Sequence, residues 1–328
     1  MRASVVTVGE AMLRLKAPGR AKLGETGYLE TCIGGAELGV AVALTRLGVP
    51  AAWISKLPTN ALGRMCAAEA RRHGVDISNL AWTADARMGL YFVETGPFPR
   101  GSSVLYDRKA SAASTLAPSD VDWASALDGA NVLHTTGITC ALSASCLASV
   151  HAAIDAARAS GCRVSFDTNY RSQLWTPADA RASVESLMPT VDLLFTSPTD
   201  ASVLFGVGGE PADVAHALKN RYGVPVVVVS VRAMGDGGLA SRGSVVLGDG
   251  LYVSTPIRFE VVDPFGAGDA FVAGFLFGLL TRDGDLGYAQ ACGDALAALK
   301  QTLPGEFATF TRDELEQALN EPSARVRR

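Results

Sequence analysis

The sequence lacks the short motifs that mark several large enzyme classes. It has no Gly-Lys pair, so it has no Walker P-loop. No Gly-x-Gly-x-x-Gly run follows a strand pattern, which argues against the usual dinucleotide-binding fold. His-Glu-x-x-His and Gly-x-Ser-x-Gly are also absent. With only four scattered histidines, a histidine-based triad or a multi-histidine metal site is disfavoured.

Charge imbalance, paired cysteines and long apolar runs are scarce as well. The net charge is −4 with a pI of about 5.6, so no basic field attracts nucleic acid. The six cysteines show neither a Cys-x-x-Cys pair nor a zinc spacing, which indicates free thiols in a reducing compartment. No apolar run approaches the roughly 18 residues of a membrane span. The first ten residues are too short in apolar length for a signal peptide. We therefore expect a cytoplasmic protein without a membrane or nucleic-acid partner.

What the sequence does contain is a globular composition, with 48% hydrophobic and 19% charged residues in a chain of 328. This length suits one large α/β domain, alone or with a small appendage. Strand patterns are expected at 4–8, 11–17, 51–55, 131–134, 161–166, 191–196, 224–229, 238–246 and 251–255. Helical patterns are expected at 38–47, 61–73, 143–159, 270–280, 288–300 and 312–319.

The stretch 262–271, Val-Asp-Pro-Phe-Gly-Ala-Gly-Asp-Ala-Phe, carries the strongest signal. It follows a β-branched run and opens an apolar helical segment, so Gly266, Ala267 and Gly268 lie at the mouth of a helix. The first N–H groups of a helix lack intrahelical partners and form an anion site. Asp269 sits in the same turn. It is either a helix-capping carboxylate or a general base that accepts a hydroxyl proton beside a transferring phosphoryl group.

Residues 88–94 and 103–108 predict an antiparallel hairpin that acts as a lid. Strand alternation places Tyr106 and Arg108 on one face of the second strand, and Tyr91 on one face of its partner. Arginine suits bidentate binding of a carboxylate. The alternative is a solvated hairpin face on which the tyrosines pack for stability.

Two further candidate ligand sites are predicted from where their residues lie relative to a helix and a strand. Gly34 and Gly35 precede a helical pattern, where paired glycines allow a ligand to approach the backbone, although a plain turn is the alternative. Asp167, Asn169 and Arg171 follow the strand at 161–166, and ligands of open α/β sheets lie beyond the carboxyl ends of strands. An Asx-type turn with a surface arginine is the alternative there.

Taken together, these motifs resemble the ribokinase-like (PfkB) carbohydrate kinases along nearly the whole chain. The lid sequence is similar to that of the 2-keto-3-deoxygluconate kinases within this family. The resemblance implies a three-layer αβα fold with a mainly parallel central sheet and a small β-sheet lid. It implies one kinase domain at 1–320, with the lid built mainly from 11–32 and 81–110, and a C-terminal tail at 321–328.

The resemblance also implies roles for individual residues. The catalytic set would be Asp269 as base, Gly266, Ala267 and Gly268 as the anion hole, and Arg171. The substrate set would be Gly34, Gly35, Tyr91, Tyr106, Arg108, Ile138, Asn169, Arg171 and Asp269. The nucleotide set would be Ser197, Ser230, Arg232, Gly235, Gly237, Gly266, Ala267, Gly268 and Asp294. Metal ligands are not assigned. The cofactors would be ATP and Mg²⁺, with a monovalent cation as a further candidate.

Five positions depart from the family pattern. Gly39 replaces an asparagine, Ser197 and Asp200 are shorter than the usual pair, Arg232 stands in place of a glycine, and Asp294 replaces an asparagine. The expected reaction is ATP-dependent phosphorylation of the primary hydroxyl of a sugar acid, 2-keto-3-deoxygluconate, at its 6-position. The alternatives are a kinase for a neutral, fructose-like sugar or a nucleoside, and a ligand-binding relative without catalysis. The configuration of the sugar at C4 stays open, and a dimer formed through the lid is expected.

Overall fold

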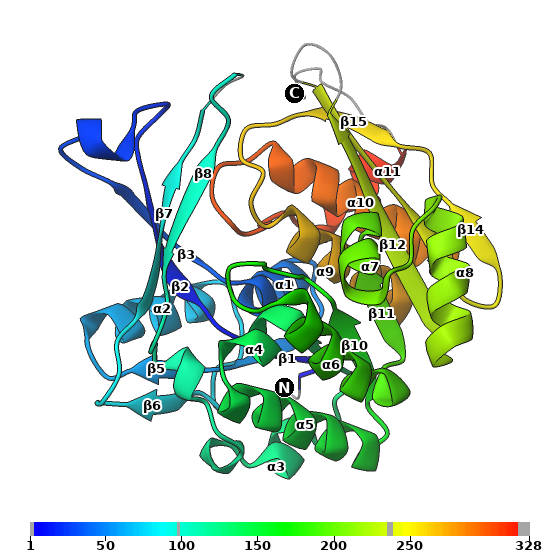
Figure 1. The fold of residues 1–328 in the computed structure, drawn as a ribbon, viewed down its shortest axis with the longest axis horizontal. Coiled ribbons are helices and arrows are strands. Elements are labelled where there is room, and N and C mark those ends of the chain that lie inside the picture. The colour runs from blue at the N-terminus through cyan, green and yellow to red at the C-terminus, as the bar shows by residue number, and fades with distance from the viewer. Residues whose placement is uncertain (1–2, 97–98, 235–238, 321–328) are drawn as a thin grey trace.

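A twisted central sheet separates two layers of helices in the computed structural model, which describes residues 3–96, 99–234 and 239–320 (Figure 1). The strand order is β14-β13-β12-β11-β10-β9-β1-β4, with β15 paired to β13. The pairs from β4 to β12 are parallel, and those of β13 are antiparallel. The strands are β1 (Val5–Val8), β4 (Ala51–Ile54), β9 (Val132–Thr136), β10 (Arg163–Asp167), β11 (Leu193–Thr196), β12 (Val226–Met234), β13 (Leu239–Leu247), β14 (Leu251–Val253) and β15 (Ile257–Glu260).

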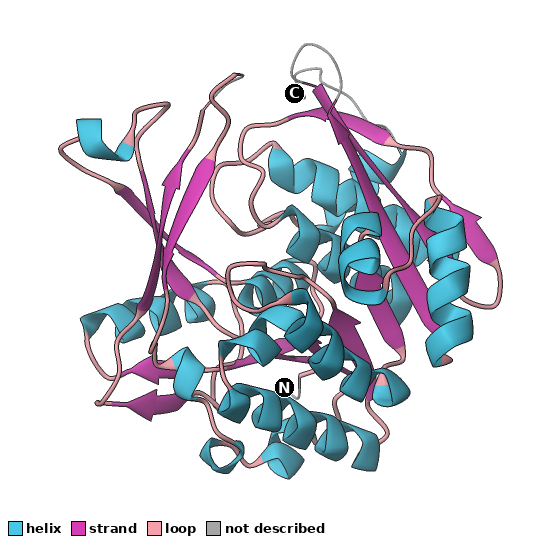
Figure 2. Ribbon diagram, viewed as in Figure 1, coloured by secondary structure: helices cyan, strands magenta, loops and turns pink. Residues whose placement is uncertain are grey.

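Helices cover both faces of this sheet, as the colouring by secondary structure shows (Figure 2). One hydrophobic core contains residues of α1 (Ala36–Arg46), α2 (Ala61–Arg72), α9 (Ala267–Thr281), α10 (Leu286–Gln301) and α11 (Arg312–Asn320). The other contains residues of α3 (Trp123–Leu127), α5 (Ala144–Ala159), α6 (Pro177–Leu187), α7 (Pro198–Phe205) and α8 (Pro211–Tyr222). Because both faces are covered, β1, β4, β9 and β11 are buried along their whole length, and β1, β4 and β11 are mainly apolar. The predicted αβα layering is confirmed.

Close packing between α9 and α10 fixes where the mouth of α9 lies. A Cβ atom on Gly274 would come 2.5 Å from the carbonyl oxygen of Cys292, and one on Gly278 would come 2.6 Å from the Cα of Ala289. The small residues that recur along α9 therefore let the two helix backbones touch. Substitution at either glycine would push α9, and with it the turn at its start, out of place.

The second sheet has four strands in the order β3-β2-β7-β8 and stands apart from the main sheet at the left of Figure 1. Its strands are β2 (Met12–Lys16), β3 (Glu30–Gly34), β7 (Gly89–Glu94) and β8 (Ser103–Asp107). The expected antiparallel hairpin is present, with Tyr91 opposite Tyr106. Residues at the start of the expected 81–110 segment pair elsewhere: β6 (Ala81–Thr83) forms a two-stranded sheet with β5 (Lys56–Pro58). We call the four-stranded sheet the lid sheet.

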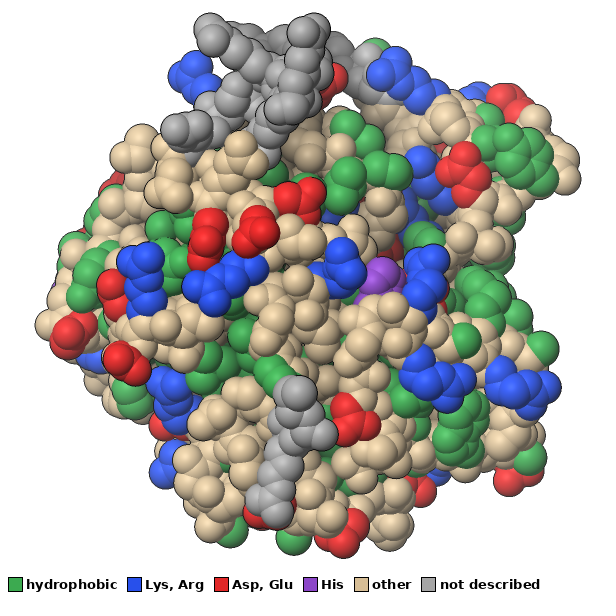
Figure 3. Space-filling model, turned by 180° about the vertical axis from the view of Figure 1, so that it is seen from behind, with side chains coloured by type: hydrophobic (Ala, Val, Ile, Leu, Met, Phe, Trp, Pro, Cys, Tyr) green, Lys and Arg blue, Asp and Glu red, His purple; other side chains and the backbone are tan. Residues whose placement is uncertain are grey.

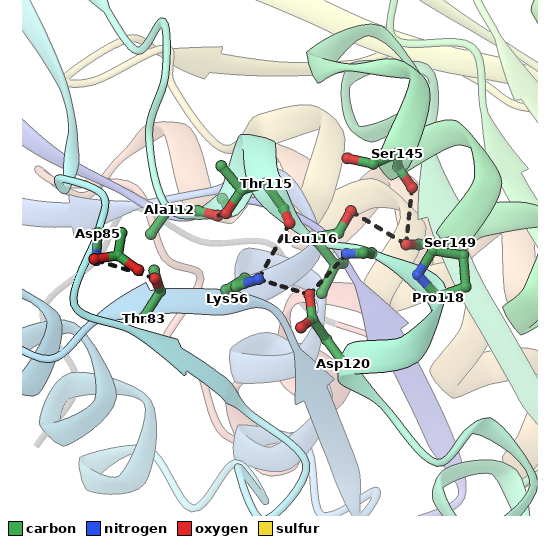
Figure 4. Close-up of polar contacts among 12 residues, drawn as sticks. Lys56, Thr83, Asp85, Ala112, Thr115, Leu116, Pro118, Asp120, Ser145 and Ser149 are labelled. Carbon is green, nitrogen blue, oxygen red and sulfur yellow. Dashed lines mark hydrogen bonds and ion pairs between the residues drawn. The ribbon is translucent and has the colours of Figure 1, made fainter.

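A polar cluster ties the chain that leaves the lid sheet to the body of the protein (Figure 4). The Nζ atom of Lys56, on β5, donates to the carbonyl oxygen of Thr115 at 3.2 Å and contacts Asp120 at 2.8 Å. Ser149 of α5 donates to the carbonyl oxygen of Leu116 at 3.3 Å. These bonds hold the segment with two short 3₁₀ turns, η2 (Ala113–Thr115) and η3 (Pro118–Asp120), against β5 and α5. This segment follows the last strand of the lid sheet.

One predicted loop is wrong. Residues from Val231 were expected to leave the strand for a nucleotide-binding loop, but β12 continues to Met234 and pairs antiparallel with β13. Arg232 is thus a strand residue opposite Arg242. The β-branched run 226–231 favours extended backbone, and the partner strand completes its hydrogen bonds. Gly235, Gly237 and the tail 321–328 lie outside the described residues. A short helix not expected from the sequence, α4 (Gly137–Leu142), follows β9.

The surface carries both signs of charge. On the face seen from behind in Figure 3, basic and acidic side chains are scattered among hydrophobic side chains and other atoms. Of the helices in the described ranges, none combines the length and apolar character needed to cross a membrane.

Candidate active site

The turn that enters α9 is held in place by a buried network of charges. Asp263 accepts hydrogen bonds from the backbone N–H of Phe265 at 3.2 Å and of Gly305 at 3.1 Å, and it pairs with Arg14 at 3.0 Å. Arg14 also pairs with Glu306 at 2.9 Å. Both side chains of the Arg14–Asp263 pair are almost completely shielded from solvent. These contacts fix the backbone just before the helix mouth.

Gly266 caps α9 in the left-handed region, with a φ of 73°. A Cβ atom there would lie 1.8 Å from the carbonyl oxygen of Glu306, so both conformation and space require glycine. A Cβ atom on Gly268 would meet nothing within 4 Å. Below the turn, the buried ammonium of Lys300 donates to the carbonyl oxygens of Leu303 at 3.2 Å and of Asp263 at 3.5 Å. These two bonds hold the backbone at Asp263, just before the turn, against the segment that follows α10.

Asp269 stands in the first turn of α9 and is half-buried. Burial raises the pKa of its carboxyl, while the positive charges of Arg171, Lys300 and Arg242 oppose that shift. A carboxylate with a raised pKa is a stronger base than an ordinary aspartate, as a proton acceptor requires.

Two cavities meet at Asp269. The larger has a volume of about 420 Å³ and lies on the side of β11, β12 and β13. The smaller, of about 90 Å³, lies beneath the lid sheet. Four residues line both of them: Arg171, Phe265, Gly266 and Asp269. One carboxylate thus faces two neighbouring compartments, which is the arrangement needed to pass a group from one bound molecule to another.

The larger cavity gathers most of the residues expected to bind a nucleotide. Its lining includes Ser197, Ser230, Arg232, Gly266, Ala267 and Gly268. It also includes Asn169, which was expected on the sugar side and does not line the smaller cavity. Asp294 is not part of the lining. Its side chain is buried on α10 and accepts a hydrogen bond from the hydroxyl of Ser244 at 2.9 Å.

The smaller cavity gathers most of the residues expected to bind the sugar. Its lining includes Gly34, Gly35, Tyr91, Tyr106, Arg108, Ile138, Arg171 and Asp269. The two glycines are needed for close packing. A Cβ atom on Gly34 would come 2.2 Å from the hydroxyl of Tyr91, and one on Gly35 would come 2.4 Å from the carbonyl oxygen of Glu10. The N-terminus of α1 therefore reaches the wall of the cavity.

The lid side of this cavity combines aromatic rings with a cation. The rings of Tyr91 and Tyr106 stack with centroids 5.8 Å apart, and the guanidinium of Arg108 lies 5.4 Å from the centre of the Tyr106 ring. Arg108 also forms a buried ion pair with Glu10, whose second oxygen accepts a hydrogen bond from Ser111 at 2.8 Å. Arg108 points into the cavity, with its charge partly neutralised by Glu10.

Sequence reasoning missed several residues of the two cavities. They are Glu10, Met12, Ala36, Glu37, Phe265 and Glu306 in the smaller, and Arg242, Phe271 and Val272 among others in the larger. Glu10 had a usable signal, because it directly follows the parallel strand β1, and ligands gather at such strand ends. Glu306 and Arg242 had none, since only the packing of distant segments brings them to the site.

Glu37 is fully buried beside Asp269. It accepts hydrogen bonds from the hydroxyls of Thr136 at 2.8 Å and Thr139 at 2.7 Å. Burial raises the pKa of Glu37 to about 7, and the two hydrogen bonds oppose the shift. Gly39, two residues further along α1, faces the base: a Cβ atom there would lie 3.4 Å from the Cβ of Asp269. The departure at position 39 thus leaves a small space directly next to the carboxylate.

Two carboxylates in the larger cavity fit a magnesium ion bound mainly through a nucleotide. Asp167 ends β10, and Asp200 lies in the first turn of α7. Burial, together with the charges of Asp200 and Asp269, raises the pKa of Asp167 to about 8, so a cation there would relieve repulsion among the three acids. No cluster of three or more histidine, cysteine or acidic side chains suited to a metal occurs in the part of the chain that the structure describes. Magnesium commonly takes one or two carboxylates and completes its shell with phosphates and water.

Two cavities that share one base beside a glycine-lined helix mouth define a phosphotransferase-type site. Over residues 2–318 the chain matches the pfkB family of carbohydrate kinases. It is 38% identical to the 2-dehydro-3-deoxygalactonokinase of Haloferax volcanii over 328 residues, the full length of both chains. The chain therefore belongs to the pfkB family of carbohydrate kinases, and the family and fold predicted from the motifs are confirmed.

Solved structures agree with this assignment. The crystal structure of 2-dehydro-3-deoxygluconokinase from Thermotoga maritima has a TM-score of 0.93 and 32% identity, covering 98% of this chain and 99% of that one. The crystal structure of fructokinase from Vibrio cholerae, with fructose, ADP and calcium ion bound, has a TM-score of 0.80 and 25% identity, covering 96% and 99% of the two chains. The fold is thus shared by kinases for acidic and for neutral sugars.

Proposed function

We propose that this protein transfers the terminal phosphoryl group of ATP to the primary hydroxyl of 2-keto-3-deoxygluconate, forming the 6-phosphate. The position of Asp269 carries the proposal, because it is the carboxylate that faces both cavities. The lid-side pair of Tyr106 and Arg108 supports an acidic sugar, since arginine is the residue type for carboxylates. The similarity to kinases for the gluconate- and galactonate-derived acids supports the same substrate class.

In this mechanism the donor occupies the larger cavity, with its phosphates at the backbone of residues 266–268. The sugar acid occupies the smaller cavity, with its carboxylate at Arg108 and its primary hydroxyl at Asp269. Asp269 accepts the hydroxyl proton as the oxygen attacks, and the N–H groups at the start of α9 stabilise the charge on the transferred group. Arg171, which lines both cavities, offsets that charge during transfer.

Magnesium would be held by Asp167 and Asp200 together with the donor phosphates, and it would screen the negative charge of the phosphates. A monovalent cation is a further candidate cofactor. The buried ammonium of Lys300 already contributes positive charge at the carbonyl oxygens below the glycine turn. Closure of the lid sheet would exclude water and so limit hydrolysis of ATP.

An apolar row on the lid sheet supports the proposal that the protein forms a dimer. Leu15, Phe92 and Leu105 lie in register across three of its strands, and Leu105 is 63% exposed. An apolar row on a sheet edge is often covered by a second copy. Sedimentation velocity of the wild type and of Leu105→Glu tests this: we expect a dimer that the substitution dissociates, and a monomeric wild type would contradict it.

A neutral sugar remains the second candidate, because Glu10 already neutralises part of the charge of Arg108. An ADP-release assay with a panel of sugars separates the two. The panel contains 2-keto-3-deoxygluconate, its C4 epimer derived from galactonate, fructose, ribose and a nucleoside. We expect kcat/KM for at least one keto-deoxy acid to exceed that for every neutral sugar by a factor of 100 or more. A preference for fructose or a nucleoside would overturn the proposal, and no turnover with any sugar would favour a binding protein.

A further inference from the structure

Arg242 is a buried cation, and none of the residues that the structure describes places a carboxylate in contact with it. It stands in the middle of β13, is 6% exposed and lines the larger cavity. Among the residues described, no acidic oxygen lies within 4.0 Å of its guanidinium, and its Nε atom has no hydrogen-bond acceptor. The guanidinium carbon lies 4.9 Å from the centre of the Phe271 ring. Buried arginines are almost always paired, because an unpaired charge is costly to remove from water.

Charged groups of both signs surround Arg242. Arg232 lies directly opposite on β12, and like charges facing each other across strands repel. Three acids attract Arg242 from a distance, Asp294 of α10 most strongly and then Asp167 and Asp269. One oxygen of Asp294 is occupied by Ser244, and the other has no partner. Burial lowers the pKa of Arg242 to about 10, so the side chain is still charged at neutral pH.

The position of Arg242 indicates which charge would complete the pair. Arg171 lines both cavities and so lies at the junction where a group would pass between them. Arg242 lines only the larger cavity, with the glycine turn and Ser197. The ring of Phe271, two residues after the base on α9, packs against the guanidinium. An anion bound to Arg242 would therefore be a phosphate of the donor that is not transferred.

We propose that Arg242 binds a non-transferred phosphate of the phosphoryl donor, which supplies the contacting negative charge that none of the described residues places at this guanidinium. The inference rests on the proposed phosphotransferase function and extends it to the donor side. It makes the extended β12–β13 pair a phosphate-binding element. The empty protein carries an unfavourable buried charge there, and donor binding relieves it.

Binding without any sugar tests the inference. The variants are Arg242→Met, which keeps the aliphatic packing on Phe271 but removes the charge, and Arg242→Lys, which keeps the charge. The matched control is Arg282→Met, because Arg282 stacks on Tyr288 at 3.6 Å and lines neither cavity. Calorimetry with ADP, AMP and adenosine, with and without Mg²⁺, gives the affinities. Thermal melting without ligand gives the stability.

We expect Arg242→Met to weaken ADP binding by about 10- to 100-fold, the range of a lost charge-assisted hydrogen bond. Adenosine binding should change by less than about threefold, and Arg242→Lys should fall in between. The melting temperature of the empty Arg242→Met variant should equal or exceed that of the wild type. ADP affinity within twofold of the wild type, or an equal loss for ADP and adenosine, would overturn the inference.

A second variant keeps the test valid if Arg242→Met does not fold. Asp294→Asn removes the competing negative charge and should leave ADP binding unchanged or up to about threefold tighter, since attraction between ADP and Arg242 then meets less competition. Weaker ADP binding would show that Arg242 needs Asp294 as a structural partner, which contradicts the inference. Because no sugar is present, the outcome is independent of the substrate: an enzyme inactive on sugar acids can still lose ADP affinity with Arg242.

Discussion

Replacing Arg108 is the most informative test of substrate class. This arginine is a positively charged lid residue that lines the smaller cavity. It forms an ion pair with Glu10. The side chains of Arg108 and Glu10 are 9% and 1% exposed, so the pair is largely removed from water. Arg108→Met would therefore remove the carboxylate-binding group and also leave Glu10 buried without a partner. The second effect has to be separated from the first.

The magnitudes of the two effects differ. A charge-assisted hydrogen bond contributes about 1.5–3 kcal/mol, so its loss should raise KM for a sugar acid by about 10- to 150-fold. Leaving one member of a buried pair alone costs stability, about 3–5 kcal/mol. In the double variant Glu10→Gln, Arg108→Met, most of the stability loss should disappear while KM for the acid stays high. Glu10→Gln alone should lower KM for the acid, because Arg108 then serves only the substrate.

The assay is ADP release with a keto-deoxy acid and with fructose, combined with thermal melting of each variant. KM for fructose should change by less than about threefold in the double variant. Equal losses for both sugars would show that Arg108 only supports the structure. A lower KM for the acid in Arg108→Met would refute the reasoning outright.

Three further predictions concern the base, the glycine turn and the acid beside it. Burial raises the pKa of Asp269 and Arg171 opposes that shift, so the acid limb of kcat/KM should have its midpoint above about pH 4, the ordinary aspartate value. Arg171→Met should move this midpoint to higher pH, and a fixed midpoint in a pH–rate profile would contradict the assignment. Gly266→Ala should lower the melting temperature and kcat strongly, because its φ is 73° and its Cβ has no room. Gly268→Ala, with nothing within 4 Å, should melt like the wild type, and equal damage in both would refute the geometry. The folded-state pKa of Glu37 is raised to about 7, so its stabilising effect is complete below about pH 4.5 and is lost as pH rises through 7. Glu37→Gln should remove this loss of unfolding free energy, which is worth up to about 3 kcal/mol at pH 8. If the melting temperatures of the wild type and the variant run parallel as pH changes, Glu37 does not titrate in that range.

The sequence was sufficient for the parts of the site that depend on local chemistry. The glycine turn before α9, the strand-end residue Arg171 and the hairpin with Tyr91 and Tyr106 are each encoded within a few neighbouring residues. Turn glycines, strand ends and strand alternation leave such local signals.

The other residues of the site are brought there by contacts between segments that are far apart in the sequence. Glu306 reaches the site because Arg14, far away in the chain, pairs with both Glu306 and Asp263. Arg242 reaches it because β12 runs on past its apolar segment and pairs with β13. The expected role of Asp294 assumed an open side chain, whereas α10 packs that carboxylate against Ser244. Burial of this kind is set by tertiary packing and leaves no mark at a single position.

The most direct test of the account is the turnover of Asp269→Asn with ATP and a keto-deoxy acid. Asparagine keeps the size of the side chain but cannot accept the hydroxyl proton, so kcat should fall by about 10³-fold or more, with KM for the sugar within about threefold of the wild type. A kcat within tenfold of the wild type, measured on protein with an unchanged melting curve, would contradict the role of Asp269 as the base shared by the two cavities.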